Sequence, residues 1–515
     1  MSEHRTVLRS TSTISTITFI SRIFGYIRDS RIAFLLGTGD VSDAFTFAYR
    51  VPNLIRRIVG EGAVSSAFIP VFSEYLNGGK RKEAWEFANI LLAAAMVFLV
   101  VLTAVGILLS PWIVPVVAYW FKVTPGKFEM TTILNRILFV YIALIGISAL
   151  ATAVLQSFNQ FAAPALAPVV LNLTVIGFSF LSGFFSSPAI AMAVGVVVGG
   201  VLQVAIQLPG VIRSGWRFHW IWDLAHPGVR RVITLLVPRL FAIGVVHIDV
   251  LIGTQFAAAM AAGSTASITF ADRVMELVLG GYVIALSTAI LPLLSRQSVE
   301  RRIEELKTTL NFAIRIVLFV TLPASVGLVL LRKPIIQVLF ERGEFSAAST
   351  ELTAWALLFF AMGLSGFAMV KIIVQAFYAL HETRAPVIVA TISLSLNIIL
   401  NFLFFHPLRN GGPALATSLS AVFDVVALTT IFRWRFGAIG MREVCRSGWK
   451  FGAAAAVMGF VTWWLIHVPG FYSGSLTHRA GALLATIVVS TVTYFGSAFL
   501  MRVREINEVW SIYYP

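Results

Sequence analysis

The stretch that decides the fold runs from Ser21 to Glu74: SRIFGYIRDSRIAFLLG at 21–37, DVSDAFTFAYRVPNLIRRIVGEGAVSSAFIP at 40–70 and VFSE at 71–74. It is apolar enough to enter a bilayer, yet it carries Arg22, Arg28, Asp29, Arg31, Asp43, Arg50, Arg56, Arg57 and Glu61. A charge near the bilayer centre costs about 2.5–3.5 kcal/mol, so such charges usually face a cavity or a partner. The stretch therefore predicts a water-filled, cationic chamber, and the rest of the chain is its frame.

The composition indicates an integral membrane protein. Of 515 residues, 58% are hydrophobic and only 12% are charged, and the mean hydropathy is +0.87. Soluble domains average about 25% charged residues, which excludes that class. The net charge of +15 suggests either a nucleic-acid partner or a positive-inside topology. The basic residues fall in short loops between apolar runs, so we expect a positive-inside topology and no nucleic-acid partner.

About fourteen apolar runs are long enough to cross about 30 Å of hydrocarbon. We expect helices, because lipid leaves the backbone no other partner outside a closed barrel, whose strands are shorter. The second and seventh runs are too long for one straight span, so bends are expected at Pro52 or Gly60–Gly62 and near Gly244. The approximate limits are 13–36, 41–76, 85–120, 131–157, 160–185, 188–213, 226–260, 267–294, 308–331, 347–379, 384–406, 412–435, 448–468 and 478–502.

The loops predict the orientation. With the N-terminus in the cytoplasm, most basic loop residues lie on the cytoplasmic side, as the positive-inside rule requires. An even number of spans then places both termini in the cytoplasm.

The chain also repeats itself. Residues 47–54, FAYRVPNL, match 270–277, FADRVMEL, at Phe, Ala, Arg, Val and Leu. Two further pairs of short segments lie at nearly the same offset: 69–73 with 291–295, and 156–164 with 375–386. The offset spans about six helices, an even number, which predicts two parallel six-helix lobes with the working site between them.

The repeat also predicts the domain limits. Residues 1–220 form the N-terminal lobe, 221–440 form the C-terminal lobe, and 441–515 carry two appended helices.

The charges of the first span can be placed on a helical wheel. Arg22 and Asp29 are seven residues apart and nearly in line at about 3.6 residues per turn. Asp29 is therefore expected to orient Arg28 or Arg31. Arginine suits a phosphate ligand because its planar fork donates two parallel hydrogen bonds and stays charged.

Two further pairs have helical spacing: Arg57 with Glu61, and Arg273 with Glu276. The alternative interpretation of all these charges is a set of ion pairs that fix the packing of the lobes.

A second polar cluster falls in the C-terminal lobe. Asp249 lies in the seventh span, Asn397 and Asn401 share a helix face in the eleventh, and Thr417 begins the twelfth. A carboxylate with amide and hydroxyl oxygens suits Na⁺ or a proton. The alternative is a hydrogen-bonded patch that joins helices.

No enzyme motif is present. The sequence has no GxSxG, HExxH or phosphate-binding loop, and the single Cys445 excludes a disulfide framework. We expect neither catalysis nor a cofactor, beyond coupling to Na⁺ or H⁺.

Four segments carry a family resemblance: SRIFGYIRD at 21–29, SDAF at 42–45, PNLIRRIVGEGAVSSAFIPVFSEY at 52–75 and FADRVMEL at 270–277. Over essentially its full length the chain resembles the MurJ (MviN) family. These proteins are bacterial lipid II flippases of the multidrug/oligosaccharidyl-lipid/polysaccharide exporter superfamily. The resemblance implies an inner-membrane protein that moves the undecaprenyl-pyrophosphate-linked peptidoglycan precursor to the periplasmic leaflet by alternating access.

The resemblance also implies roles for individual residues. The family's central-cavity arginines match Arg22, Arg28 and Arg273, and its other sensitive charges match Asp43, Arg56, Arg57 and Glu276. Together with Asp29, the expected charge partner, these residues are the candidate substrate-binding set. The two appended helices correspond to the groove for the lipid tail. The family's cation site resembles Asp249, Asn397, Asn401 and Thr417, but an Asp is expected where Asn401 stands.

Expected partners are lipid II, membrane lipids and the cell-wall synthesis machinery, and the protein is expected to be monomeric. Two alternative functions remain open at this point. One is export of another lipid-linked oligosaccharide or a drug, and the other is a membrane scaffold that transports nothing.

Overall fold

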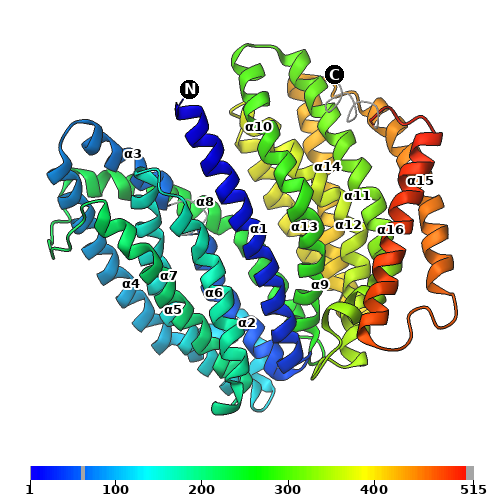
Figure 1. Ribbon diagram of the computed structural model, residues 1–515, viewed down its shortest axis with the longest axis horizontal. Coiled ribbons are helices and arrows are strands. Elements are labelled where there is room, and N and C mark those ends of the chain that lie inside the picture. Colours follow the sequence, from blue (N-terminus) through cyan, green and yellow to red (C-terminus); the bar gives the residue numbers. More distant parts are fainter. Residues whose placement is uncertain (1, 59–63, 506–515) are drawn as a thin grey trace. The chain divides into compact units, whose positions relative to one another are not determined.

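The computed structural model describes the backbone of residues 2–58 and 64–505, and their side chains apart from 2–15, 51, 55–58, 66, 238–252 and 254. Every regular element in these ranges is helical, with no strand among them (Figure 1). The α-helices are α1 (Ser2–Leu36), α2 (Asp40–Ile58), α3 (Val64–Asn77), α4 (Arg81–Val117), α5 (Lys127–Ser157), α6 (Ala162–Phe180), α7 (Pro188–Arg213), α8 (Pro227–Ala258), α9 (Ser264–Val278), α10 (Ile284–Val299), α11 (Ile303–Phe340), α12 (Ala347–Ala379), α13 (Arg384–Leu408), α14 (Gly411–Phe436), α15 (Met441–Ile466) and α16 (Leu476–Leu500). Short turns η2 (Tyr119–Val123), η3 (Ser182–Phe184) and η4 (Leu279–Val283) complete the set.

Eleven helical spans within the described residues are long and apolar enough to cross a bilayer. They comprise α4 to α7, the continuous span Ser264–Val299, and α11 to α16. The predicted spans 13–36, 41–76 and 226–260 are not among the eleven. The all-helical membrane fold is confirmed, and the count of about fourteen stays a prediction.

The expected bends have different outcomes. The predicted second span consists of two helices, α2 and α3, and the bend expected at Gly60–Gly62 lies outside the described residues. Pro52 lies inside α2, which continues to Ile58. The seventh span is the single helix α8, which runs through Gly244.

By internal packing the chain forms two compact units. Unit 1 comprises Met1–Gly263 and Arg342–Glu344, and unit 2 comprises Ser264–Glu341 and Phe345–Pro515. Helix α8 belongs to unit 1 because it packs against α2, α3 and α4. Compact units need not coincide with repeat units, so the predicted division at 220 and 440 stays a prediction.

The predicted repeat is visible in the packing inside each unit. In unit 1, α2 and α4 pack on α5, while α5 and α6 pack on α7. In unit 2, α9 and α11 pack on α12, while α12 and α13 pack on α14. The two sets of helices share one packing pattern, as the sequence repeat predicts. Helices α15 and α16 lie outside it and pack on α11.

Small residues allow corresponding helices to approach closely. A Cβ at Gly200 of α7 would lie 2.8 Å from the ring of Tyr141 in α5. In unit 2, a Cβ at Gly363 of α12 would lie 2.4 Å from Oγ of Ser418 in α14. Membrane helices commonly associate through such small residues, because their packing depends on contact rather than on hydrophobic exclusion.

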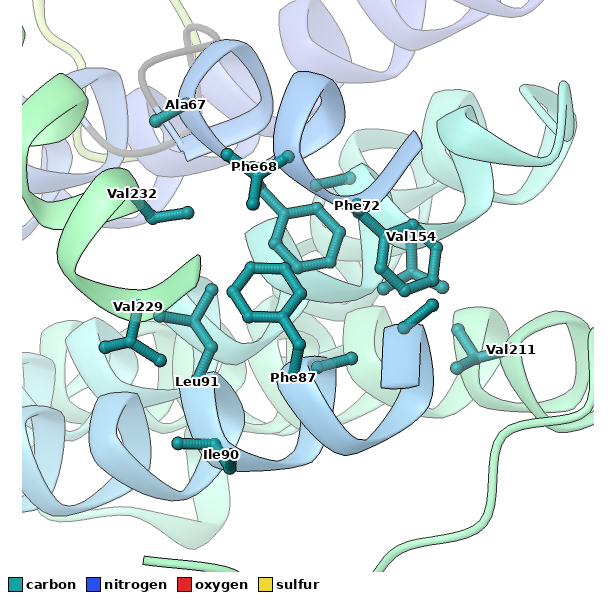
Figure 2. Packing of buried hydrophobic residues seen from close by; sticks show 14 of the residues in the cluster. Ala67, Phe68, Phe72, Phe87, Ile90, Leu91, Val154, Val211, Val229 and Val232 are labelled. Carbon is teal, nitrogen blue, oxygen red and sulfur yellow. The ribbon is translucent and has the colours of Figure 1, made fainter. Parts of the chain in front are cut away.

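An aromatic cluster joins α3 to the rest of unit 1 (Figure 2). The ring centroid of Phe68 lies 4.9 Å from that of Phe72 and 5.5 Å from that of Phe87 in α4. Val229 and Val232 add the first turns of α8 to the same cluster. This packing explains why α8 groups with unit 1.

Candidate functional site

All three guanidinium nitrogens of Arg28 in α1 donate hydrogen bonds. Its Nε and Nη2 donate to Oδ1 of Asp29 at 2.9 and 2.7 Å, and its Nη1 donates to Oδ1 of Asn172 in α6 at 2.9 Å. The Asn172 amide in turn donates to the carbonyl of Ser21 at 3.1 Å. The side chains of Arg28 and Asp29 are 15% and 13% exposed. The sequence left open whether Asp29 orients Arg28 or Arg31. The structure shows that Asp29 orients Arg28.

Asp43 of α2 lies in a buried ion pair. Its Oδ2 accepts hydrogen bonds from Nζ of Lys127 at 2.8 Å and from the backbone N–H of Gly263 at 2.9 Å. The Lys127 ammonium also contacts Asp40 at 3.0 Å and lies 4.2 Å from the ring centroid of Phe121. Asp43 and Lys127 are 1% and 5% exposed. This arrangement ties the start of α2 to the start of α5 and to the turn after α8.

Gly263 fits that turn for a steric reason. It has a positive φ of 84°, and a Cβ there would lie 2.8 Å from the carbonyl oxygen of Thr38. Only glycine adopts this backbone readily and also leaves room for the turn before α2.

Arg273 and Glu276 of α9 form the predicted i,i+3 pair. Nη1 of Arg273 donates to Oε2 of Glu276 at 2.7 Å, and the two side chains are 31% and 41% exposed. The pair directly precedes the π-helical turn η4, which contains Gly280 and Gly281. Single π turns within α-helices are frequent at functional sites.

The second polar cluster is also brought together in unit 2. Nδ2 of Asn401 donates to Oδ1 of Asn397 at 2.7 Å, and Nδ2 of Asn397 lies 3.4 Å from Oγ1 of Thr417. Among the described residues, the buried Oδ1 of Asn401 has no hydrogen-bond partner. The three described side chains offer a cation only neutral oxygens, and an amide already occupies that of Asn397. Because the side chain of Asp249 lies outside the described set, the Na⁺ site and the hydrogen-bonded patch both stay predictions.

The remaining predicted residues are placed as follows. Arg22 lies on α1 and is exposed. Arg56 and Arg57 lie at the end of α2 and Asp249 lies in α8, but their side chains fall outside the described set. Glu61 falls outside the described residues altogether, so its pairing with Arg57 stays a prediction.

Sequence reasoning missed two partners. Asn172 is the only amide side chain in the largely apolar α6, and this was its only signal. Lys127 lies between the predicted spans 85–120 and 131–157, yet it begins α5 and is buried. Both bind residues distant in the sequence, which helical spacing cannot predict.

Two arginines of the described chain are oriented by carboxylates. No three His, Cys, Asp or Glu side chains come together as a metal site among the described residues. Each unit instead presents an arginine oriented by a carboxylate, Arg28 in unit 1 and Arg273 in unit 2. An oriented guanidinium can exchange part of its hydrogen bonding for a phosphate oxygen.

Comparison with known proteins gives one consistent family. The sequence model of the family described as "Lipid II flippase MurJ" matches residues 32–480. A Vibrio cholerae protein described as "Probable lipid II flippase MurJ" is 33% identical over 511 residues, covering 97% of each chain.

Solved structures give the same fold. One described as "Lipid II flippase MurJ, inward closed conformation" aligns with a TM-score of 0.81 at 25% identity, covering 95% of this chain and 98% of that one. A multidrug resistance MATE family transporter of the MOP superfamily aligns with a TM-score of 0.68 at 14% identity, covering 84% and 98%. The second likeness concerns the fold alone.

Proposed function

Because the chain belongs to the MurJ family of lipid II flippases, we propose that it moves lipid II from the cytoplasmic to the periplasmic leaflet of the bacterial inner membrane. The observation that carries this proposal is the family match along nearly the whole chain, on a helical membrane fold with the same architecture. It favours the flippase over a related exporter or a scaffold. The family transports its substrate, which agrees with the expectation that no catalysis occurs.

The arginines supply the recognition chemistry in this proposal. Lipid II carries a diphosphate between a sugar–peptide head and a polyprenyl tail. The guanidinium groups of Arg28 and Arg273 bind this diphosphate, because a planar fork donates two parallel hydrogen bonds to phosphate oxygens. Arg22, Asp43, Arg56, Arg57 and Glu276 are the further charges of the proposed site.

The two appended helices carry the tail in this proposal. Their exposed side chains include Phe460 and Trp464 of α15, and Leu484 and Val492 of α16. A polyprenyl chain is apolar along its length and can lie against such side chains without losing hydrogen bonds.

Coupling is proposed to rest chiefly on the membrane potential. The cluster of Asn397, Asn401 and Thr417 offers neutral oxygens, so it attracts Na⁺ weakly unless Asp249 adds its charge. A proton or Na⁺ contribution through Asp249 is the minor part of the proposal. The protein acts as a monomer with both termini in the cytoplasm, and it supplies the cell-wall synthesis machinery at the outer surface.

Depletion in living cells tests the function. Cells that lose this protein are expected to lyse while lipid II accumulates in the cytoplasmic leaflet. An unrelated lipid II flippase should restore growth and serves as the control. Lysis without that accumulation would contradict the flippase and favour the scaffold.

A further inference from the structure

Arg31 lies near the end of α1, and its guanidinium lies over two aromatic rings. Its guanidinium carbon lies 4.8 Å from the ring centroid of Phe34 and 4.2 Å from that of Phe180 at the end of α6. Its Nε donates to Oγ of Ser179 at 3.2 Å. Ile27 and Phe34, one turn before and one turn after, are both exposed.

The charge of Arg31 is not balanced within the described part of the chain. No described carboxylate forms a salt bridge with it, whereas Arg28 one turn earlier is paired with Asp29. No described residue accepts a hydrogen bond from Nη1 or Nη2 of Arg31. A cation in apolar surroundings is costly without an anion. An external anion would therefore gain from binding here.

The geometry leaves one edge of the guanidinium open. The guanidinium carbon lies over both aromatic rings, and Nε donates to Ser179. The remaining edge holds the two terminal nitrogens, which together form the fork that matches two oxygens of a phosphate. In Arg28, by comparison, Asp29 accepts from Nε and Nη2 and Asn172 accepts from Nη1, so all three nitrogens have partners.

The position of Arg31 suggests the source of the phosphate. Arg31 lies five residues before α1 ends at Leu36, at the end that the loop charges predict to be periplasmic. Phe180 and Phe34 are 67% and 37% exposed. A long arginine side chain near the end of a membrane helix can extend its charged group to the layer where the hydrocarbon meets the lipid headgroups.

We propose that a binding site for a lipid phosphate lies at the periplasmic surface of the inner membrane. It is formed by Arg31, Ser179, Phe34 and Phe180. Two sources share this chemistry: the headgroup of an anionic phospholipid and the diphosphate of a polyprenyl lipid. Only the second source rests on the proposed function. In that case the site receives the diphosphate as the substrate reaches the outer leaflet.

Lipid titration of the purified full-length protein tests the site. Phosphatidylglycerol and undecaprenyl diphosphate are added separately, and the bound lipid is counted by native mass spectrometry. Arg31→Gln is expected to weaken at least one lipid by about tenfold or more, since it removes a charge-assisted hydrogen-bonded pair. Arg31→Lys should weaken it less, because it keeps the charge and loses the fork.

A second variant and a control keep the test decisive. Phe180→Leu should weaken the same lipid by about threefold through loss of one ring face. Arg136→Gln, at an exposed arginine of α5, is the matched control and should leave affinity unchanged. Size-exclusion chromatography confirms that each variant is folded.

The outcomes separate the two sources. A loss confined to phosphatidylglycerol assigns the site to phospholipid, and a loss that includes undecaprenyl diphosphate assigns it to the transported lipid class. If folded Arg31→Gln binds both lipids within about twofold of the unaltered protein, the site does not exist. The experiment measures lipid binding and not transport. Its result can therefore be interpreted even if the proposed flippase function is wrong.

Discussion

Arg28 and Arg273 are each paired with a carboxylate, but their surroundings differ. The Arg28–Asp29 pair is mostly buried, and Asn172 holds its third nitrogen. The Arg273–Glu276 pair is about one-third exposed, and an exposed pair is worth only about 0–1 kcal/mol. Breaking the exposed Arg273–Glu276 pair to bind a phosphate therefore costs less than breaking the mostly buried Arg28–Asp29 pair.

Asp43 and Lys127 allow a stability prediction at the same scale. Lys127→Met leaves the Asp43 carboxylate buried without its cation, which is expected to cost about 3–5 kcal/mol and to lower the unfolding temperature. The double variant Asp43→Asn/Lys127→Met removes both charges and keeps an oxygen for the Gly263 N–H. It should unfold at a higher temperature than the Lys127→Met single variant. Equal or greater loss in the double variant would show that the ion pair is not what stabilises this junction.

Residue pairs close in sequence were predictable, and distant pairs were not. Helical spacing predicted Arg273 with Glu276, and the neighbouring charges limited the partner of Asp29 to Arg28 or Arg31. The bonds from Arg28 to Asn172 and from Lys127 to Asp43 join different helices. Their formation depends on how helices pack, which a single sequence does not specify.

At the scale of elements, the span Ser264–Val299 differs from a regular helix. A π turn at Leu279–Val283 adds a residue to one turn and so changes the register between Arg273 and the second half of the span. Periodicity predicted the span at 267–294 but gave no sign of this turn, because one extra residue hardly alters an apolar pattern.

Deletion of Gly281 tests the role of the π turn. It should convert the turn to regular α-helix with little rotation of the two halves, because the wider π turn already accommodates the extra residue. We expect a folded protein with reduced lipid II transport, measured against Gly281→Ala, which keeps the residue count. A Cβ at this position meets open space, so the control should fold. Full transport by the deletion variant would make the π turn incidental.

The appended helices are held to α11 at several points. Arg315 of α11 pairs with the buried Glu505, and the hydroxyl of Tyr494 in α16 donates to the Phe319 carbonyl at 2.8 Å. Arg479 at the start of α16 contacts Glu341 at 3.4 Å. The repeat predicted that these helices lie outside the two lobes. It could not predict that Arg315 of α11 pairs with Glu505, which follows them.

Deleting residues 448–515 should leave an inserted protein that no longer transports a polyprenyl lipid. The deletion also leaves Arg315 without Glu505, which lowers stability and can mimic loss of function. The deletion is therefore combined with Arg315→Gln, and membrane level is measured together with transport. If this combined variant still supports growth, the two helices do not carry the lipid tail.

At the scale of the whole molecule, transport needs a source of energy. Each elementary charge moved across the membrane is worth about 2.3 kcal/mol per 100 mV. The described amide cluster offers little attraction for Na⁺, so we expect flipping to stop when the potential is collapsed and to fall less when choline replaces Na⁺. Asp249→Asn should be milder than Arg28→Ala. Loss of activity only on removing Na⁺ would instead make the polar cluster the coupling site.

The fold class, the repeat and the membrane class were all predictable from composition and spacing. Apolar runs of span length leave the helix as the only stable option in lipid, and the repeated segments specify matching packing. Helix α8 was placed with the second lobe by the repeat, whereas its contacts with α2, α3 and α4 group it with unit 1. Such grouping depends on three-dimensional contacts that no local pattern encodes.

The most direct test is a leaflet-resolved assay of lipid II translocation in proteoliposomes containing the unaltered protein, Arg28→Ala or Arg273→Ala. Each arginine is proposed to bind the diphosphate, so both variants should insert at normal levels and fail to move lipid II. Lysine at either position should rescue poorly, because an ammonium is a point charge without the fork. Normal translocation by both alanine variants would contradict diphosphate binding and leave the charges a packing role.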